Sequence, residues 1–131
     1  MERPEHYESD ILFFFDGRAA ELALYEALFT RMDAAFPQAS VKVQKTQISF
    51  CQRHLFAASS LPLHRKKGWP EHSLVVTIGL ARRLDSPRVA VAVEPYPGRW
   101  THHVFLTDPE EIDNELLDWL EEARIFAVSK R

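Results

Sequence analysis

The sequence predicts an α+β domain: a mostly antiparallel β-sheet with an N-terminal and a C-terminal helix packed on one face. Three observations predict this class. A helical repeat of apolar residues covers 17–36, strand patterns follow between residues 41 and 106, and a capped acidic helix begins near residue 108. We expect a single domain over 1–131, with its core at about 12–126 and a solvated lead-in over 1–10.

The first predicted helix covers residues 17–36. Its apolar side chains recur at intervals of three and four and form one stripe: Leu22, Tyr25, Phe29, Met32 and Phe36. Asp16 is the candidate N-cap, because its carboxylate can accept hydrogen bonds from the free amides of the first turn. Pro37 ends the helix.

The segment after this helix is strand material with one interruption. Val41 and Val43 have the opposite parity to Ile48 and Phe50, so an unbroken strand cannot bury both pairs on one face. We expect a bulge or tight turn near residues 45–47, or burial of each pair on a different face. Further strands are predicted over 55–60, 74–80, 89–93 and 101–106.

The last two strands and the final helix have clear local signals. Pro97 and Gly98 suit the centre of a type II turn, which predicts a hairpin. Asp108, Pro109 and Glu111 form a capping box with proline at the first helical position. The buried face of the helix is predicted to hold Ile112, Leu116, Trp119, Leu120 and Ala123, and the opposite face is acidic.

Composition indicates an ordinary globular protein with segregated charge. Hydrophobic residues make up 46% of the chain and charged residues 27%. The net charge of −3 hides a basic middle: residues 41–88 hold nine basic and two acidic residues. Both flanks are acidic, so the parts either face each other or leave a basic surface. We expect a cytoplasmic protein without a membrane segment, because Cys51 is the only cysteine and no apolar run spans a bilayer.

The strand "KTQISF", the hairpin "SPRVAVAVEPYPGRWTHHVFL" and the acidic helix after it resemble a family of small bacterial domains of unknown function, the family numbered 5655. The resemblance covers roughly residues 12–126. It implies a compact α+β domain from a bacterial cytosol. It implies no activity, because the family has no established activity or catalytic residues.

His102 and His103 in "RWTHHV" are the most conspicuous candidate site residues. Neighbouring side chains on a strand point to opposite faces, so the two should not bind one metal ion together. We expect no metal, because no recognised ligand array surrounds them. A histidine in a cleft near Trp100 and Glu94 could still serve as an acid or base, because its pKa lies near neutrality.

A row of polar residues on the preceding strand gives a second candidate. Lys45, Gln47 and Ser49 share one parity and could line a pocket on the sheet face away from the helices. A solvated strand face explains the same pattern. The predicted pocket lies where this strand meets the 94–103 hairpin, and its remaining residues are Glu94, Arg99, Trp100, His102 and His103.

Other chemistries have weaker support. Basic residues interleaved with aromatic ones could bind single-stranded nucleic acid: Arg53, His54, His64, Arg65, Lys66, Lys67, Arg82, Arg83 and Arg88. The acidic overall balance argues against nucleic acid. Four dispersed glycines exclude a phosphate loop or dinucleotide fingerprint, and no G-x-S-x-G elbow is present, so no cofactor is predicted.

The sequence favours binding over catalysis and leaves the ligand open. The leading hypothesis is a binding module for a small anion or an acidic segment of a protein partner, with Lys45, Gln47 and Arg99 as donors. One alternative is an enzyme with a histidine and Glu94 as acid and base. Another is a protein-interaction or homodimerisation module that uses a sheet edge.

Overall fold

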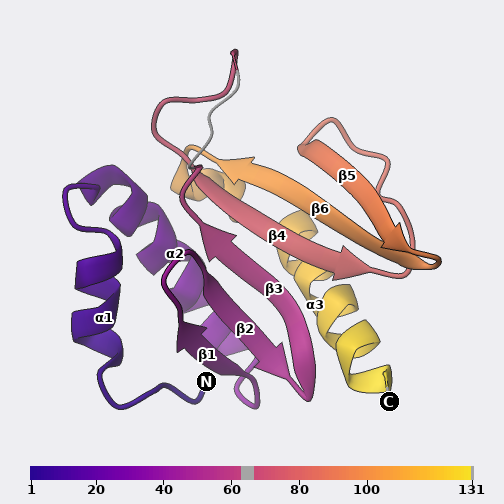
Figure 1. Ribbon diagram of the computed structural model, residues 1–131, viewed down its shortest axis with the longest axis horizontal. Coiled ribbons are helices and arrows are strands. Elements are labelled where there is room, and N and C mark those ends of the chain that lie inside the picture. The colour runs from indigo at the N-terminus through magenta and orange to yellow at the C-terminus, as the bar shows by residue number, and fades with distance from the viewer. Residues whose placement is uncertain (63–66, 131) are drawn as a thin grey trace.

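The computed structural model describes residues 1–62 and 67–130 (Figure 1). Within them, helices flank a run of strands, which confirms the predicted α+β class. The elements are α1 (Tyr7–Phe14), α2 (Ala19–Ala35), β1 (Ser40–Val43), β2 (Ile48–Gln52), β3 (His54–Ser60), β4 (Leu74–Leu80), β5 (Val89–Tyr96), β6 (Arg99–Leu106), the 3-10 helix η1 (Pro109–Glu111) and α3 (Asn114–Ser129). No described helix combines the length and apolarity that crossing a bilayer requires.

The strands form one antiparallel sheet in the order β1-β2-β3-β4-β6-β5. β4 pairs with β6 along its whole length, from Leu74 opposite Leu106 to Leu80 opposite Trp100. The pairing of β3 with β4 is shorter and covers only 57–60 and 75–78. Beyond these residues the two strands diverge, as Figure 1 shows.

The helices cover one face of the sheet and leave the other uncovered. α2 and α3 pack against the sheet, and α1 lies beside β1 and joins the same core (Figure 1). Fully buried side chains from both layers meet there, including Leu28, Ile48, Ile78 and Leu120. We call the other side the open face; it carries Ser49, Ala58, Thr77, Thr101 and His103.

The N-terminal residues are mostly exposed but include the start of a helix. Residues 2–6 and 8–10 are exposed, whereas α1 begins at Tyr7 and both Tyr7 and Ile11 are buried. Glu2 forms a parallel bridge with Ser40 at the edge of the sheet. Asp16 does not cap the next helix: α2 begins at Ala19, and its N-cap position is Arg18, which makes no side-chain cap.

The interruption predicted near residues 45–47 is a tight turn. The amide of Gln44 donates to the carbonyl of Gln47 at 2.9 Å, which closes the hairpin between β1 and β2. Val41 then lies opposite Phe50, and both are buried in the core. The turn therefore puts strand segments of opposite parity on the same face of the sheet.

The capping box is present, but it opens a different helix from the predicted one. The Asp108 side chain accepts from the amide of Glu110, and Pro109–Glu111 form the short 3-10 helix η1. Asp113 caps α3 by accepting from the amide of Leu116 at 3.0 Å. The predicted buried face is confirmed at Ile112, Leu116, Trp119, Leu120 and Ala123.

Candidate functional site

Two adjoining cavities border the open face of the sheet, and the first also reaches the end of α3 on the helix side. The first, which we call the hairpin pocket, has a volume of about 260 Å³ and includes Leu55, Gly79, Tyr96, Arg99 and Lys130 in its lining. The second, the loop pocket, has a volume of about 420 Å³ and includes Trp69, Val91, His103 and Phe105. Gln47 and Thr77 line both cavities, so the two are neighbours, and we call them together the groove.

The hairpin pocket exists because β3 and β4 diverge. Leu55 and Phe56 on β3 have no partners on β4, and Gly79 and Leu80 on β4 have none on β3. All four residues line the cavity, together with the end of α3 and the hairpin that joins β5 to β6. Gly79 adds no side chain, and a Cβ built there would meet no atom within 4 Å.

Two cations line the hairpin pocket. Lys130 is half-buried, with Nζ 4.4 Å from the ring centre of Phe126, and Arg99 is exposed at the start of β6. Burial lowers the pKa of Lys130, and the nearby positive charge of Arg99 lowers it further. Over residues 1–62 and 67–130, neither side chain forms an ion pair with a carboxylate. An anion placed between them would relieve this repulsion.

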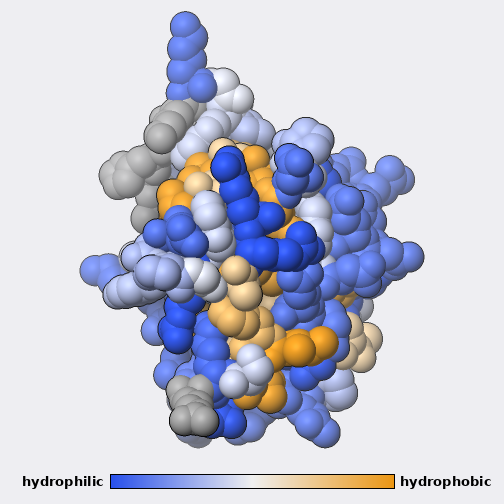
Figure 2. All heavy atoms as spheres, turned by 90° about the vertical axis from the view of Figure 1, so that its right-hand side faces the viewer, coloured by the Kyte–Doolittle hydropathy of each residue, from blue (hydrophilic) through white to orange (hydrophobic). Residues whose placement is uncertain are grey.

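Exposed apolar side chains surround the same end of the sheet. Leu55 is 49% exposed, Tyr96 67% and Ile125 55%. Figure 2 shows one side of the molecule on which apolar side chains reach the surface among polar ones. Leu55 and Tyr96 also line the hairpin pocket, so its two cations stand beside apolar walls.

The loop pocket has aromatic walls and polar, uncharged groups. The rings of Trp69 and Phe105 meet edge to face, with 4.8 Å between their centroids. Thr77 Oγ1 lies 3.0 Å from Nδ1 of His103, which orients the imidazole. Burial lowers the pKa of His103, so this ring is neutral near pH 7. No Asp, Glu, Lys or Arg among the described residues lines this pocket.

The two histidines of "RWTHHV" have different environments. His102 is fully buried on the core face, where its Nδ1 donates to the carbonyl of Ile78 at 3.2 Å. Its Nε2 accepts from the amide of Leu84 at 2.9 Å. Both ring nitrogens are therefore used inside the core, whereas His103 faces the groove.

Gln47 connects the β1–β2 turn to the groove. Its Nε2 donates to Ser49 Oγ at 2.9 Å, and that hydroxyl donates in turn to the side-chain oxygen of Gln44. Ser49 is buried beneath this network. Gln47 lines the hairpin pocket together with residues of the 94–103 hairpin, although β3 and β4 lie between them in the sheet.

The other predicted site residues are more scattered. Trp100 lines the hairpin pocket, with the Arg83 guanidinium 5.8 Å from its ring centre. Lys45 is exposed in the β1–β2 turn and lines none of the described cavities. Glu94 accepts from the amide of Gly98 at 3.1 Å within the hairpin turn, and no described hydrogen bond joins it to either His102 or His103.

Sequence reasoning missed two residues that shape the groove. Lys130 follows a helix whose exposed face is acidic, and nothing local indicates that it reaches the sheet. Thr77 could have been predicted, because side chains alternate between the two faces of a strand and Thr77 lies between Val76 and Ile78. Its register partner on β6 is His103.

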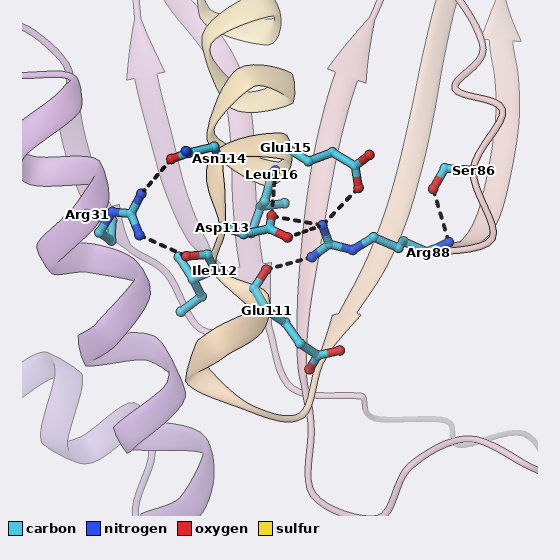
Figure 3. Close-up of polar contacts among 9 residues, drawn as sticks. All are labelled: Arg31, Ser86, Arg88, Glu111, Ile112, Asp113, Asn114, Glu115 and Leu116. Carbon is cyan, nitrogen blue, oxygen red and sulfur yellow. Dashed lines mark hydrogen bonds and ion pairs between the residues drawn. The ribbon is translucent and has the colours of Figure 1, made fainter.

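The basic segment and the acidic helix face each other in part. Arg82 forms a bidentate pair with Glu122, and both of its distances are 2.9 Å. Arg88 binds Asp113, Glu115 and the carbonyl of Glu111, as Figure 3 shows. Of the other residues in the predicted basic surface, His64, Arg65 and Lys66 lie outside the described residues.

The same close-up shows how the start of α3 is held. Arg31 on α2 donates to the carbonyl of Ile112 at 2.9 Å, and Arg88 donates to the carbonyl of Glu111 from the other side (Figure 3). The Arg88 guanidinium also stands 5.6 Å from the ring centre of Trp119. Arg88 thus has structural partners and is not a free cation for a ligand.

No cluster of three or more metal-binding side chains stands together in the described part of the chain. Cys51 is half-buried on β2, and burial raises the pKa of its thiol.

A family model described as "Domain of unknown function (DUF5655)" matches residues 13–124. No curated protein and no solved structure matches the chain.

Proposed function

The chain belongs to the family described as Domain of unknown function (DUF5655), and we propose that it is a binding module for a small ligand bearing an anionic group. The observation that carries the proposal is the pair of cations in the hairpin pocket. Arg99 and Lys130 line one cavity, and neither has an acidic partner among the described residues.

The environment of Lys130 supports an anion in particular. A half-buried ammonium is poorly solvated, and its lowered pKa reflects that burial together with the charge of Arg99. A phosphate or carboxylate would restore a counter-charge. Hydrogen bonds between ionised partners are about twice as strong as neutral ones, so two cations can hold a small anion firmly.

The shape of the site favours a small molecule over a protein segment. The cavity is recessed between diverging strands and joins the larger loop pocket, and concave pockets with a few polar groups are typical of small-ligand sites. The exposed rim of Leu55 and Tyr96 also suits an acidic peptide with an apolar residue. That occupant is the alternative outcome of the test below.

The test is calorimetric titration of the whole chain with inorganic phosphate, ribose 5-phosphate and an acidic hexapeptide. We expect the small phosphates to bind, and we expect Arg99→Ala and Lys130→Ala each to weaken that binding by about tenfold or more. Lys42→Ala is the matched control, because Lys42 is exposed on β1 and lines neither pocket. It should bind as the unmodified chain does.

A second variant blocks the pocket without removing charge. Gly79→Val adds a side chain where a Cβ meets no neighbour, and valine suits a strand, so the fold should be retained. Its side chain would occupy the pocket floor and abolish phosphate binding. The proposal is wrong if phosphates bind Gly79→Val and Arg99→Ala as tightly as they bind the unmodified chain. It is also wrong if only the peptide binds.

A further inference from the structure

The loop pocket extends the anion site along the open face. Gln47 and Thr77 belong to both linings, so a ligand that extends across these two side chains would reach both cavities. The chemistry changes along this path. Cations stand at the hairpin end, whereas aromatic rings and neutral hydrogen-bonding groups stand at the other.

The neutral end is suited to a planar ring with a polar edge. Trp69 and Phe105 offer aromatic surface, and aromatic pairs favour offset or edge-to-face contacts with a further ring. Thr77 fixes His103 through Nδ1, and Nε2 has no partner among the described residues. The amide of Gln47 presents both a donor and an acceptor nearby. These groups can hydrogen-bond the edge of a heteroaromatic ring.

The spacing of the two ends favours an extended ligand. Arg99 and His103 are four residues apart on β6 and share one face of the sheet. At about 3.3 Å per residue, their Cα atoms are roughly 13 Å apart. A ligand with a spacer between its ring and its anionic group matches this separation.

We propose that the groove binds a nucleoside monophosphate, with the base in the loop pocket, the ribose over Thr77 and the phosphate between Arg99 and Lys130. The base lies against Trp69 and Phe105, and Gln47 and His103 hydrogen-bond its edge. Thr77 acts as a positioning residue, because its hydroxyl orients the imidazole. This inference rests on the proposed anion site and adds the identity of the rest of the ligand.

Whole and partial ligands separate the two ends of the groove. The probes are uridine and adenosine 5′-monophosphate, the corresponding nucleosides, and ribose 5-phosphate. Because linking two weak contacts makes the second one intramolecular, at least one monophosphate should bind about a hundredfold more tightly than either of its parts. Calorimetry measures each affinity.

Variants of the neutral end test the placement of the base. Thr77→Val removes the hydroxyl with little change of shape, and His103→Leu removes the hydrogen-bonding ring. Each should weaken nucleotide binding by about fivefold to tenfold, and His103→Leu should leave ribose 5-phosphate binding unchanged, because His103 lines only the loop pocket. Lys42→Ala again serves as the control. Tryptophan emission locates the base: in Trp100→Phe, which keeps Trp69 and Trp119, the nucleotide should still quench emission, and the quenching should be lost when Trp69→Phe is added.

The outcomes distinguish the inference from the proposed function. If both monophosphates bind no more tightly than ribose 5-phosphate, yet Arg99→Ala weakens them all, the nucleotide assignment is overturned and the anion site stands. The assignment is also overturned if the nucleotide binds Thr77→Val and His103→Leu as tightly as the unmodified chain and does not quench the emission of Trp69. If no phosphate binds the chain, both proposals fail.

Discussion

His102 and His103 are neighbours on β6 whose imidazoles lie on opposite sides of the sheet. His102 joins the carbonyl of Ile78 to the amide of Leu84 within the core, and His103 meets Thr77 on the open face. The adjacent side chains therefore belong to different parts of the molecule. One holds a loop onto the sheet, and the other lines a groove.

Substitution of the two histidines should affect stability very differently. His102→Ala removes a fully buried ring and leaves the amide of Leu84 and the carbonyl of Ile78 without partners. We expect a loss of about 3 kcal/mol in the free energy of unfolding. His103→Ala should cost less than about 1 kcal/mol. Urea unfolding measures both, and equal losses would contradict the structural assignment.

Stability should decrease as the pH falls below about 6.5. Burial lowers the pKa of His102 from its ordinary value of 6.5, and the charges of Arg82 and Arg83 contribute in the same direction. Burial also lowers the pKa of His103. Below pH 6.5 the unfolded chain binds protons that the folded chain does not bind. The free energy of unfolding therefore decreases between pH 6.5 and the lowered pKa values.

A non-titrating variant checks the source of this dependence. Protonated His102 would direct an N–H at the amide hydrogen of Leu84, so the neutral form is required in the fold. We expect the urea concentration at the unfolding midpoint of the unmodified chain to be lower at pH 5.5 than at pH 8. His102→Gln should show a smaller decrease, and an equal decrease in that variant would refute the assignment to His102.

Arg88 should stabilise the fold more than Arg82 does. Arg88 reaches two carboxylates and a carbonyl and stands over Trp119, and its side chain is 22% exposed. We expect Arg88→Ala to cost about 2 kcal/mol. Arg82 pairs with one exposed carboxylate, so Arg82→Ala should cost less than about 1 kcal/mol. Thermal unfolding of both variants measures the difference.

The hairpin turn should require glycine at residue 98. Gly98 has φ +72°, a conformation that side chains with a Cβ rarely adopt. We expect Gly98→Ala to cost about 1 kcal/mol through backbone strain alone, because no atom lies within 4 Å of the added Cβ. Gly79→Ala is the control on the same side of the sheet. It should be neutral or slightly stabilising in thermal unfolding.

The sequence predicted the elements that carry local signals, and it missed those fixed by tertiary contacts. The strand over 74–80 is rich in β-branched residues, the strand over 101–106 follows the turn at Pro97 and Gly98, and both are present. α1 was missed because apolar side chains lie on both sides of it: Ile11 is buried, whereas Leu12 and Phe13 are exposed. A helix without a single apolar stripe has no amphipathic signal.

The candidate site was predictable only in outline. Strand parity correctly put His102 and His103 on different faces, and Gln47 lines the same cavity as residues of the hairpin. Parity could not show that Glu94 would be held by the Gly98 amide. Nor could it show that Lys130 would reach the sheet, because the course of α3 depends on packing between distant segments.

The short pairing of β3 with β4 divides the sheet into two halves joined along 57–60 and 75–78. Such a seam is the place where local opening costs least, since few backbone hydrogen bonds must break there. The groove crosses this seam, with Gln47 on one half and His103 on the other. An occupant that touches both halves would restrain their relative motion. Amide hydrogens along the seam would then exchange more slowly with deuterium when the groove is filled, and those of β1 would be unaffected.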